Sequence, residues 1–178
     1  MFFNWKGDKM EKLEVVKASV VNLEVEAIVN AANSELLRGG GVCGAIFDQA
    51  GFELDRECNT IGRCETGEAV ITKGYGLKAK YIIHTVAPKW YDFYEKNKEE
   101  LLRNCYKNSL ELAKQKGIKT IAFPCVGTGI YQCPLELGCE YAMEEAMKQQ
   151  KYFDKIVFAC FREEEYVVYQ EKLKNFID

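Results

Sequence analysis

The chain has 178 residues, which suits one domain with a substantial hydrophobic core. Its formal charge is -3 at pH 7, so there is no general basic field to attract nucleic acid. No apolar run is long enough to cross a membrane, and the first residues are charged too early for a signal peptide. We therefore expect one cytoplasmic domain over residues 1–178, with residues 1–12 as a surface segment whose aromatic side chains are tucked against the body.

The cysteines do not indicate a disulfide framework or a metal site. Eight are present, but a chain of this length does not need disulfide bonds to hold its core. There is no C-x-x-C motif and only one histidine, His84, so we predict no metal and no cofactor. Most thiols should be small buried hydrophobic groups. His84 lies in an apolar run and is expected to be a hydrogen-bonded core or rim residue.

Apolar runs alternate with amphipathic stretches along the chain. The apolar runs predict strands at residues 13–17, 26–30, 67–72, 81–86, 119–123 and 155–161. The amphipathic stretches predict helices at residues 42–59, 99–116, 134–150 and 163–176, the first with Ala45, Ile46, Ala50 and Leu54 on its inner face. The first two strands read as a hairpin-like pair. The alternation after them predicts an α/β fold, with a mostly parallel sheet and helices on both faces.

Two glycine-rich loops follow predicted strands, at residues 30–44 and 124–131. In parallel sheets, ligands bind outside the carboxyl ends of the strands. A glycine-rich loop that opens into a helix presents backbone N–H groups to phosphate. The two loops together therefore predict a cleft that holds a diphosphate from both sides.

Residues 39–44 also match the G-x-G-x-x-G pattern of dinucleotide-binding folds. Eight residues separate this pattern from Asn30 at the strand end, and no strand ends in an acidic residue about 20 positions further on. A nicotinamide dinucleotide therefore fits poorly. The patterns of a nucleoside triphosphatase loop and of a serine hydrolase elbow do not occur.

Several segments, in this order and spacing, resemble the macrodomain family. They are residues 27–34, 39–42, 44–46, 64–74, 79–86, 121–124 and 127–131. The resemblance extends from about Leu13 to near the C-terminus, and is closest to the bacterial type that includes O-acetyl-ADP-ribose deacetylases and mono-ADP-ribosyl hydrolases. It implies a three-layer α/β/α macrodomain with a mixed, mostly parallel sheet of six or seven strands. The implied partner is an ADP-ribose-type small molecule or an ADP-ribosylated protein.

The resemblance also implies roles for individual residues. Asn33 would face the distal ribose and position the reacting centre, and Tyr131 would pack on that ribose. Phe161 would cover the adenine, with Val20 near its other face. The loop N–H groups would hold the diphosphate. The implied binding residues are Ser19, Val20, Asn30, Ala31, Asn33, Gly39, Gly40, Gly41, Val42, Gly127, Thr128, Gly129, Ile130, Tyr131 and Phe161.

The chain departs from the family pattern at two important positions. Ser19 stands where relatives often carry an acidic residue that reads the adenine amino group, and it accepts hydrogen bonds less strongly than a carboxylate. Cys43 stands where hydrolytic relatives have an aspartate thought to activate water, and Phe47 replaces a frequent histidine. A neutral thiol is not a general base. A helix N-terminus lowers the pKa of a thiol, however, so a Cys43 thiolate acting as nucleophile or base is one hypothesis, and a filled pocket wall without chemistry is the other.

Three functions follow from these departures. The first is hydrolysis of an ADP-ribosyl ester, either O-acetyl-ADP-ribose or an ester on an acidic side chain. Some relatives without the aspartate are thought to use a water activated by the ligand phosphate, so this function does not require Cys43. The second is an ADP-ribose reader with little turnover. The third, which follows from Ser19, is the binding of another nucleotide.

Overall fold

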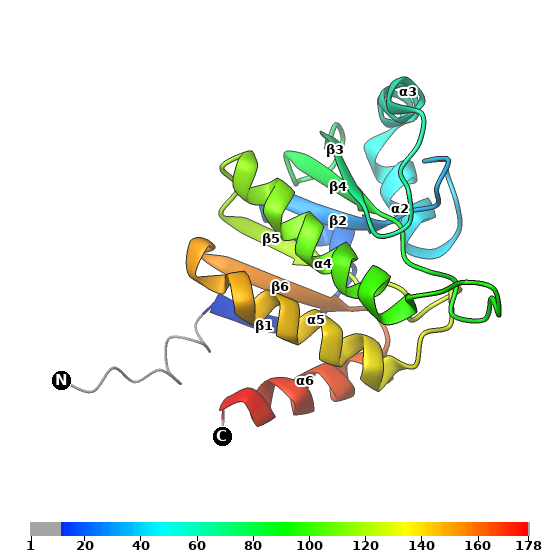
Figure 1. Ribbon diagram of the computed structural model, residues 1–178. Helices are drawn as coiled ribbons and strands as arrows, with labels where there is room; N and C mark the ends of the chain where they lie inside the picture. Colours follow the sequence, from blue (N-terminus) through cyan, green and yellow to red (C-terminus); the bar gives the residue numbers. More distant parts are fainter. Residues whose placement is uncertain (1–11, 178) are drawn as a thin grey trace.

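The computed structural model describes residues 12–177, so the predicted aromatic segment at the start of the chain lies outside the described residues, apart from Lys12 (Figure 1). The strands are β1 (Leu13–Lys17), β2 (Ala27–Ala31), β3 (Ala69–Lys73), β4 (Tyr81–Thr85), β5 (Thr120–Phe123) and β6 (Lys155–Cys160). The helices are α2 (Gly41–Ala50), α3 (Phe52–Ile61), α4 (Lys98–Gln115), α5 (Leu135–Gln149) and α6 (Glu163–Ile177), with short 3-10 turns η1 (Val20–Asn22) and η2 (Gln150–Tyr152).

The described strands form one six-stranded sheet in the order β1-β6-β5-β2-β4-β3. All neighbouring pairs are parallel except β3 and β4, which are antiparallel. The predicted mixed, mostly parallel sheet is therefore confirmed. The predicted hairpin-like pairing of the first two strands is wrong, because β1 pairs with β6 at the sheet edge while β2 lies between β5 and β4. The burial patterns agree: β1 alternates between buried and half-buried residues, whereas β2 is buried almost throughout.

Helices cover both faces of the sheet, which gives the predicted three layers (Figure 1). One apolar core lies under α4, α5 and α6, and a second lies under α2 and α3. Alternate residues of β2 enter the two cores: Ala27 and Val29 point to the first, and Ile28 to the second. Both cores reach the carboxyl ends of the central strands and so hold the loops there in place. None of the helices in residues 12–177 is long and apolar enough to span a bilayer.

The predicted helix at residues 42–59 is two helices, α2 and α3, separated by Gly51. Gly51 has φ +96°, a conformation that ends α2, and its N–H donates to the carbonyl of Phe47. Ala45 is exposed, contrary to the prediction, and Cys43 and Phe47 are buried with Ile46 on the inner face. The first turn of α2 thus begins directly beside the carboxyl end of β2.

Candidate functional site

A cleft of about 620 Å³ lies at the carboxyl ends of β1, β2, β5 and β6, within the size range of small-molecule sites. Both predicted glycine-rich loops contribute to its walls. Its lining residues are Ser19, Ala31, Ala32, Asn33, Gly39, Gly40, Gly41, Val42, Cys43, Ala45, Ala87, Pro124, Cys125, Gly127, Gly129, Ile130, Tyr131, Ala159, Phe161, Arg162 and Glu165. Most of the residues predicted for the site are therefore brought together in one cleft.

Three predicted binding residues lie behind the cleft wall. Val20 is 3% exposed and belongs to the core under α2, and Asn30 is fully buried. The Thr128 hydroxyl donates to the carbonyl of Cys125 at 3.1 Å, which turns this side chain away from the cleft lining. These three residues therefore do not line the cleft in this structure, and their part in ligand binding stays a prediction.

The first wall is the N-terminus of α2. Gly40 is the N-cap residue, and no described side chain caps this end, so first-turn N–H groups are available to an anion. Gly44 lies one turn further on and must be glycine, because a Cβ there would come within 2.5 Å of the Gly39 carbonyl oxygen. No atom lies within 4 Å of where a Cβ on Gly40 would be, so the loop backbone is open toward a ligand.

The second wall is the turn at residues 124–131. Gly127 has φ +84°, and a Cβ there would lie 3.0 Å from a Leu102 methyl. The N–H of Cys133 donates to the carbonyl of Gly127 at 2.9 Å, and that of Gln132 donates to Gly129 at 3.0 Å. These bonds hold the turn in a fixed shape opposite α2. A wall of this kind does not first have to become ordered when a ligand arrives.

Asn33 lines the cleft, and its amide is fixed by the loop. Its Oδ1 accepts from the N–H of Leu37 at 2.9 Å, and its Nδ2 donates to the Leu37 carbonyl at 2.8 Å. Each end of the amide still has one hydrogen or lone pair for another partner. The two bonds define the orientation in which Asn33 would meet a ligand.

Cys43 is a buried thiol in the first turn of α2. It is 6% exposed, and burial raises the pKa of the Cys43 thiol above its ordinary value. Of the two hypotheses for Cys43, this direction favours the pocket wall over the thiolate, because desolvation outweighs the lowering interactions with Asn30, Gly39 and Arg38. The sulfur accepts from Asn30 Nδ2 at 3.7 Å, and the thiol donates to the Leu37 carbonyl at 3.6 Å.

A buried polar chain runs from Cys43 into the sheet. Asn30 Nδ2 lies 3.1 Å from His84 Nδ1, and His84 Nε2 lies 2.9 Å from the Thr72 hydroxyl. Burial lowers the pKa of His84 to about 4, so the ring is neutral at physiological pH. The prediction of a hydrogen-bonded core histidine is confirmed. Asn30 Oδ1 has no hydrogen-bond partner among the described residues.

Sequence reasoning missed the only charged groups among the residues that line the cleft, Arg162 and Glu165. The N–H of Arg162 donates to Glu165 Oε1 at 2.8 Å, an arrangement that caps α6. The Arg162 guanidinium pairs with Glu164 at 3.2 Å. The available signal for a helix start at the cleft was a run of three glutamates that is separated from the end of β6 by two residues. The remaining missed residues, Ala32, Ala45, Ala87, Pro124, Cys125 and Ala159, are small or apolar.

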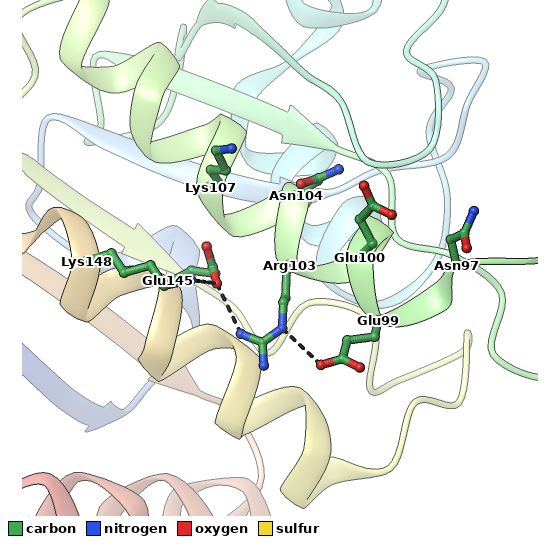
Figure 2. Close-up of a pocket in the computed structure, with 8 residues that line it drawn as sticks. All are labelled: Asn97, Glu99, Glu100, Arg103, Asn104, Lys107, Glu145 and Lys148. Atoms are coloured by element: carbon green, nitrogen blue, oxygen red, sulfur yellow. Dashed lines mark hydrogen bonds and ion pairs between the residues drawn. The ribbon is translucent and has the colours of Figure 1, made fainter.

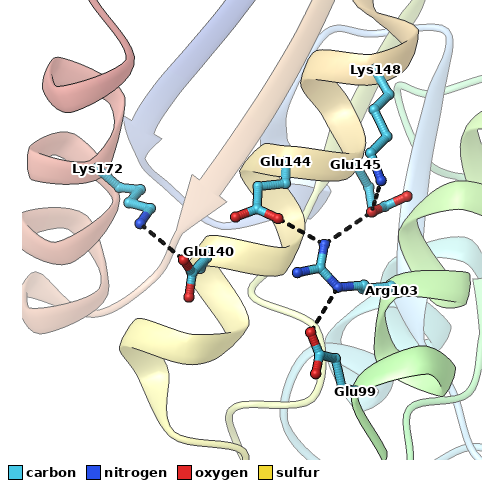
Figure 3. A network of polar contacts seen from close by, with 7 residues as sticks. All are labelled: Glu99, Arg103, Glu140, Glu144, Glu145, Lys148 and Lys172. Carbon is cyan, nitrogen blue, oxygen red and sulfur yellow. Dashed lines mark hydrogen bonds and ion pairs between the residues drawn. The ribbon is translucent and has the colours of Figure 1, made fainter. Parts of the chain in front are cut away.

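A second hollow, of about 480 Å³, lies between α4 and α5 (Figure 2). We call it the α4–α5 groove; it is lined by Asn97, Glu99, Glu100, Arg103, Asn104, Lys107, Glu145 and Lys148. Arg103 is its centre and pairs with Glu99, Glu144 and Glu145, and Lys148 also pairs with Glu145 (Figure 3). The charges of this groove are largely matched by one another.

The eight cysteines are all free, and all but the half-buried Cys125 are buried, as predicted for small hydrophobic groups. Within residues 12–177, no three His, Cys, Asp or Glu side chains gather where they could hold a metal ion. The polar groups that border the cleft are backbone N–H groups, the Asn33 amide, the Ser19 and Tyr131 hydroxyls, the Cys43 and Cys125 thiols and the two charges at the start of α6.

The model of the Macro domain family matches residues 29–142, which include both glycine-rich loops. The chain belongs to the macro domain family. This macrodomain is 44% identical over 175 residues to the ADP-ribose glycohydrolase MACROD2 of Xenopus laevis. The alignment covers 96% of this chain and 42% of that protein, so this chain spans less than half of MACROD2.

Two solved structures are similar over most of the macrodomain. The Oceanobacillus iheyensis macrodomain with ADP superposes with a TM-score of 0.87 at 40% identity, covering 94% of this chain and 93% of that one. The Trypanosoma brucei macrodomain in complex with ADP-ribose gives a TM-score of 0.85 at 41% identity, covering 90% of this chain and 68% of that one. The predicted family and α/β macrodomain fold are thus confirmed.

Proposed function

We propose that this macrodomain binds ADP-ribose or an ADP-ribosyl derivative in the cleft. The observation that carries the proposal is the pair of facing backbone walls, residues 39–42 and 127–131, in a cleft whose lining has little charge. Backbone N–H groups at a helix N-terminus bind a diphosphate without a lysine, which suits a chain of net charge -3. The similar Oceanobacillus and Trypanosoma structures contain ADP and ADP-ribose, which supports the proposal.

In the proposed pose the diphosphate lies between the two glycine-rich walls. The adenine lies at the end with Ser19 and Phe161, whose ring is 69% exposed and so available to a base. The distal ribose lies at the other end, beside Asn33 and Tyr131. The fixed amide of Asn33 would then hydrogen-bond this ribose.

Hydrolysis of an ADP-ribosyl ester is a second candidate, favoured by the similarity to a protein named ADP-ribose glycohydrolase. The buried thiol of Cys43 is not a suitable general base, since its pKa is raised. A hydrolytic step would instead use a water held against the ligand phosphate, with Asn33 orienting the distal ribose. Without such a water, the cleft would be an ADP-ribose reader.

The two functions are separated by incubating the chain with a mono-ADP-ribosylated protein and with O-acetyl-ADP-ribose. We compare the wild type with Asn33→Ala and Cys43→Asp. Turnover by the wild type that falls in Asn33→Ala supports hydrolysis. Turnover that is gained only in Cys43→Asp would show that the wild type is not a hydrolase, and would favour an ADP-ribose reader. Binding of neither compound by the wild type rejects the proposal as a whole.

A further inference from the structure

Large apolar side chains that are exposed to solvent gather around the cleft. Nine are exposed in the described residues, and six of them lie on segments that line or border the cleft: Leu37, Tyr91, Phe93, Tyr94, Ile130 and Phe161. Single exposed apolar residues are ordinary on a protein surface, but a concentration beside a binding cleft marks an interaction site. Four of the six, Tyr91, Phe93, Tyr94 and Ile130, lie on the turn that carries Tyr131 or on the loop bonded to it, and we call these four the aromatic rim.

The loop at residues 89–97 attaches the rim to the cleft wall. The N–H of Trp90 donates to the carbonyl of Tyr131 at 2.7 Å, and the Lys89 ammonium lies 6.0 Å from the centre of the Tyr131 ring. Trp90 is half-buried and packs against the core. The aromatic rim is therefore continuous with the end of the cleft where the distal ribose is proposed to lie.

The rim is held in place in the absence of a partner. The carbonyl of Lys89 accepts from the N–H of Asp92 at 3.0 Å, and the Asp92 carboxylate accepts from the N–H of Tyr94 at 2.9 Å. The Phe93 and Tyr94 rings meet edge to face, with their centres 5.6 Å apart. The two residues are 89% and 85% exposed. An ordered loop that presents two large rings loses little conformational entropy when it binds.

The charges beside the rim balance. Lys89 and Lys96 are matched by Asp92 and Glu95, so the loop has no basic surface for a phosphate backbone. Aromatic rings on a loop with no net charge favour apolar side chains of a polypeptide instead. The rim is thus suited to protein rather than to nucleic acid.

We propose that the aromatic rim binds the polypeptide that carries the ADP-ribosyl group, through apolar side chains next to the modified residue. The proposal rests on the proposed function: a chain attached at the distal ribose would leave the cleft beside Tyr131 and meet the rim. ADP-ribose would supply the common part of the affinity, and the rim would select among modified proteins.

The test uses two peptides that each carry one serine-linked ADP-ribose, one with leucine and valine flanking the serine and one with glycine. Affinities are measured for both peptides and for free ADP-ribose, with the wild type, the double variant Phe93→Ser/Tyr94→Ser and the control Phe52→Ser. Phe52 is a matched control because it is 79% exposed at the start of α3, outside the cleft lining. The melting temperature of each variant shows whether the fold is retained.

We expect the wild type to bind the apolar-flanked peptide roughly tenfold more tightly than the glycine peptide, since two aromatic rings become covered. The double variant should lose this difference and keep its affinity for ADP-ribose within about twofold, because the changes lie outside the cleft lining. Phe52→Ser should behave as the wild type. The flank effect should persist between about 50 and 300 mM salt, unlike a contact with phosphates.

Equal affinities of the wild type for the two peptides, with ADP-ribose still bound, would overturn the rim and leave the proposed function intact. Loss of ADP-ribose binding in a folded double variant would show that the loop shapes the cleft instead of docking a polypeptide. An oligonucleotide with a terminal ADP-ribose that bound more tightly than the apolar peptide, in a salt-dependent way, would assign the rim to nucleic acid. If the wild type bound no ADP-ribose compound, the proposed function itself would fail.

Discussion

The cleft and the α4–α5 groove are both hollows, and they differ in what their polar groups contact. The groove is lined by six charged side chains, and four of them, Glu99, Arg103, Glu145 and Lys148, pair with one another (Figures 2 and 3). The cleft has few charges, but it is bordered by the uncapped first turn of α2 and by a fixed glycine turn. A ligand gains most where polar groups lack partners, so the cleft is the better candidate although the groove is more charged.

The comparison is most strongly tested by placing a carboxylate in each hollow. Gly129→Glu adds a negative charge to the cleft wall, and no atom lies within 4 Å of the new Cβ position, so the fold should be retained. We expect ADP-ribose affinity to fall by about a hundredfold, because a like charge beside the diphosphate costs several kcal/mol. Calorimetry gives the affinity, and Asn104→Glu in the groove is the control, with no change expected. Equal losses in the two variants would contradict the distinction between the hollows.

The groove should matter for stability. Arg103 pairs with Glu145, whose side chain is 5% exposed. The Arg103 guanidinium also lies 4.5 Å from the centre of the Tyr141 ring. Arg103→Met leaves that carboxylate with less compensation, so we expect a loss of about 2 kcal/mol in the free energy of unfolding. ADP-ribose affinity should stay within about twofold. Urea denaturation measures the first quantity, and a large loss of affinity would show that the groove and the cleft are coupled.

The buried polar chain behind the cleft should make stability depend on pH. His84 has a pKa of about 4 in the folded chain and about 6.5 when unfolded, so as pH falls below 6.5 the unfolded state binds the proton first. The penalty appears below pH 6.5 and grows until about pH 4. Between pH 7 and about pH 5.5 it should reach about 1.4 kcal/mol. Urea denaturation of the wild type and of His84→Gln should show this loss in the wild type alone, and parallel curves would contradict it.

The smallest effect is expected at Cys43. The thiol makes long contacts of 3.6 and 3.7 Å, and its pKa is raised by burial. Cys43→Ala should therefore change ADP-ribose affinity by less than about threefold and leave any turnover unchanged, since no catalytic base is removed. Single-turnover assays with O-acetyl-ADP-ribose measure this. A loss of turnover greater than the loss of binding would restore a catalytic role for the thiol.

Local pattern was sufficient to predict much of this molecule. The strands, the helices and the two glycine-rich loops are local features of the sequence, and the segments near Asn33 and Tyr131 carry the family resemblance. What the sequence did not reveal depends on contacts between distant segments. The pairing of β1 with β6 is one case, and the position of Glu165 beside the cleft is another.

The errors at residues 43–51 have a similar origin. A helical pattern continues across Gly51, and only the positive φ of this residue divides it into α2 and α3. The thiolate hypothesis for Cys43 considered only the helix N-terminus, which is a local effect. The burial that raises the pKa of Cys43 comes from packing against β2 and the loop at Leu37. These contacts cannot be predicted from the residues next to Cys43 in the sequence.

The central claim is that the cleft recognises ADP-ribose through both of its ends. Calorimetric titration of the chain with ADP-ribose, ADP and AMP tests it most directly, because these ligands differ in the distal ribose and in the diphosphate. ADP-ribose should bind most tightly and AMP most weakly, since in the proposed pose Asn33 and Tyr131 meet the distal ribose and the glycine walls meet the diphosphate. An affinity for ADP-ribose no greater than that for ADP would contradict the proposed roles of Asn33 and Tyr131.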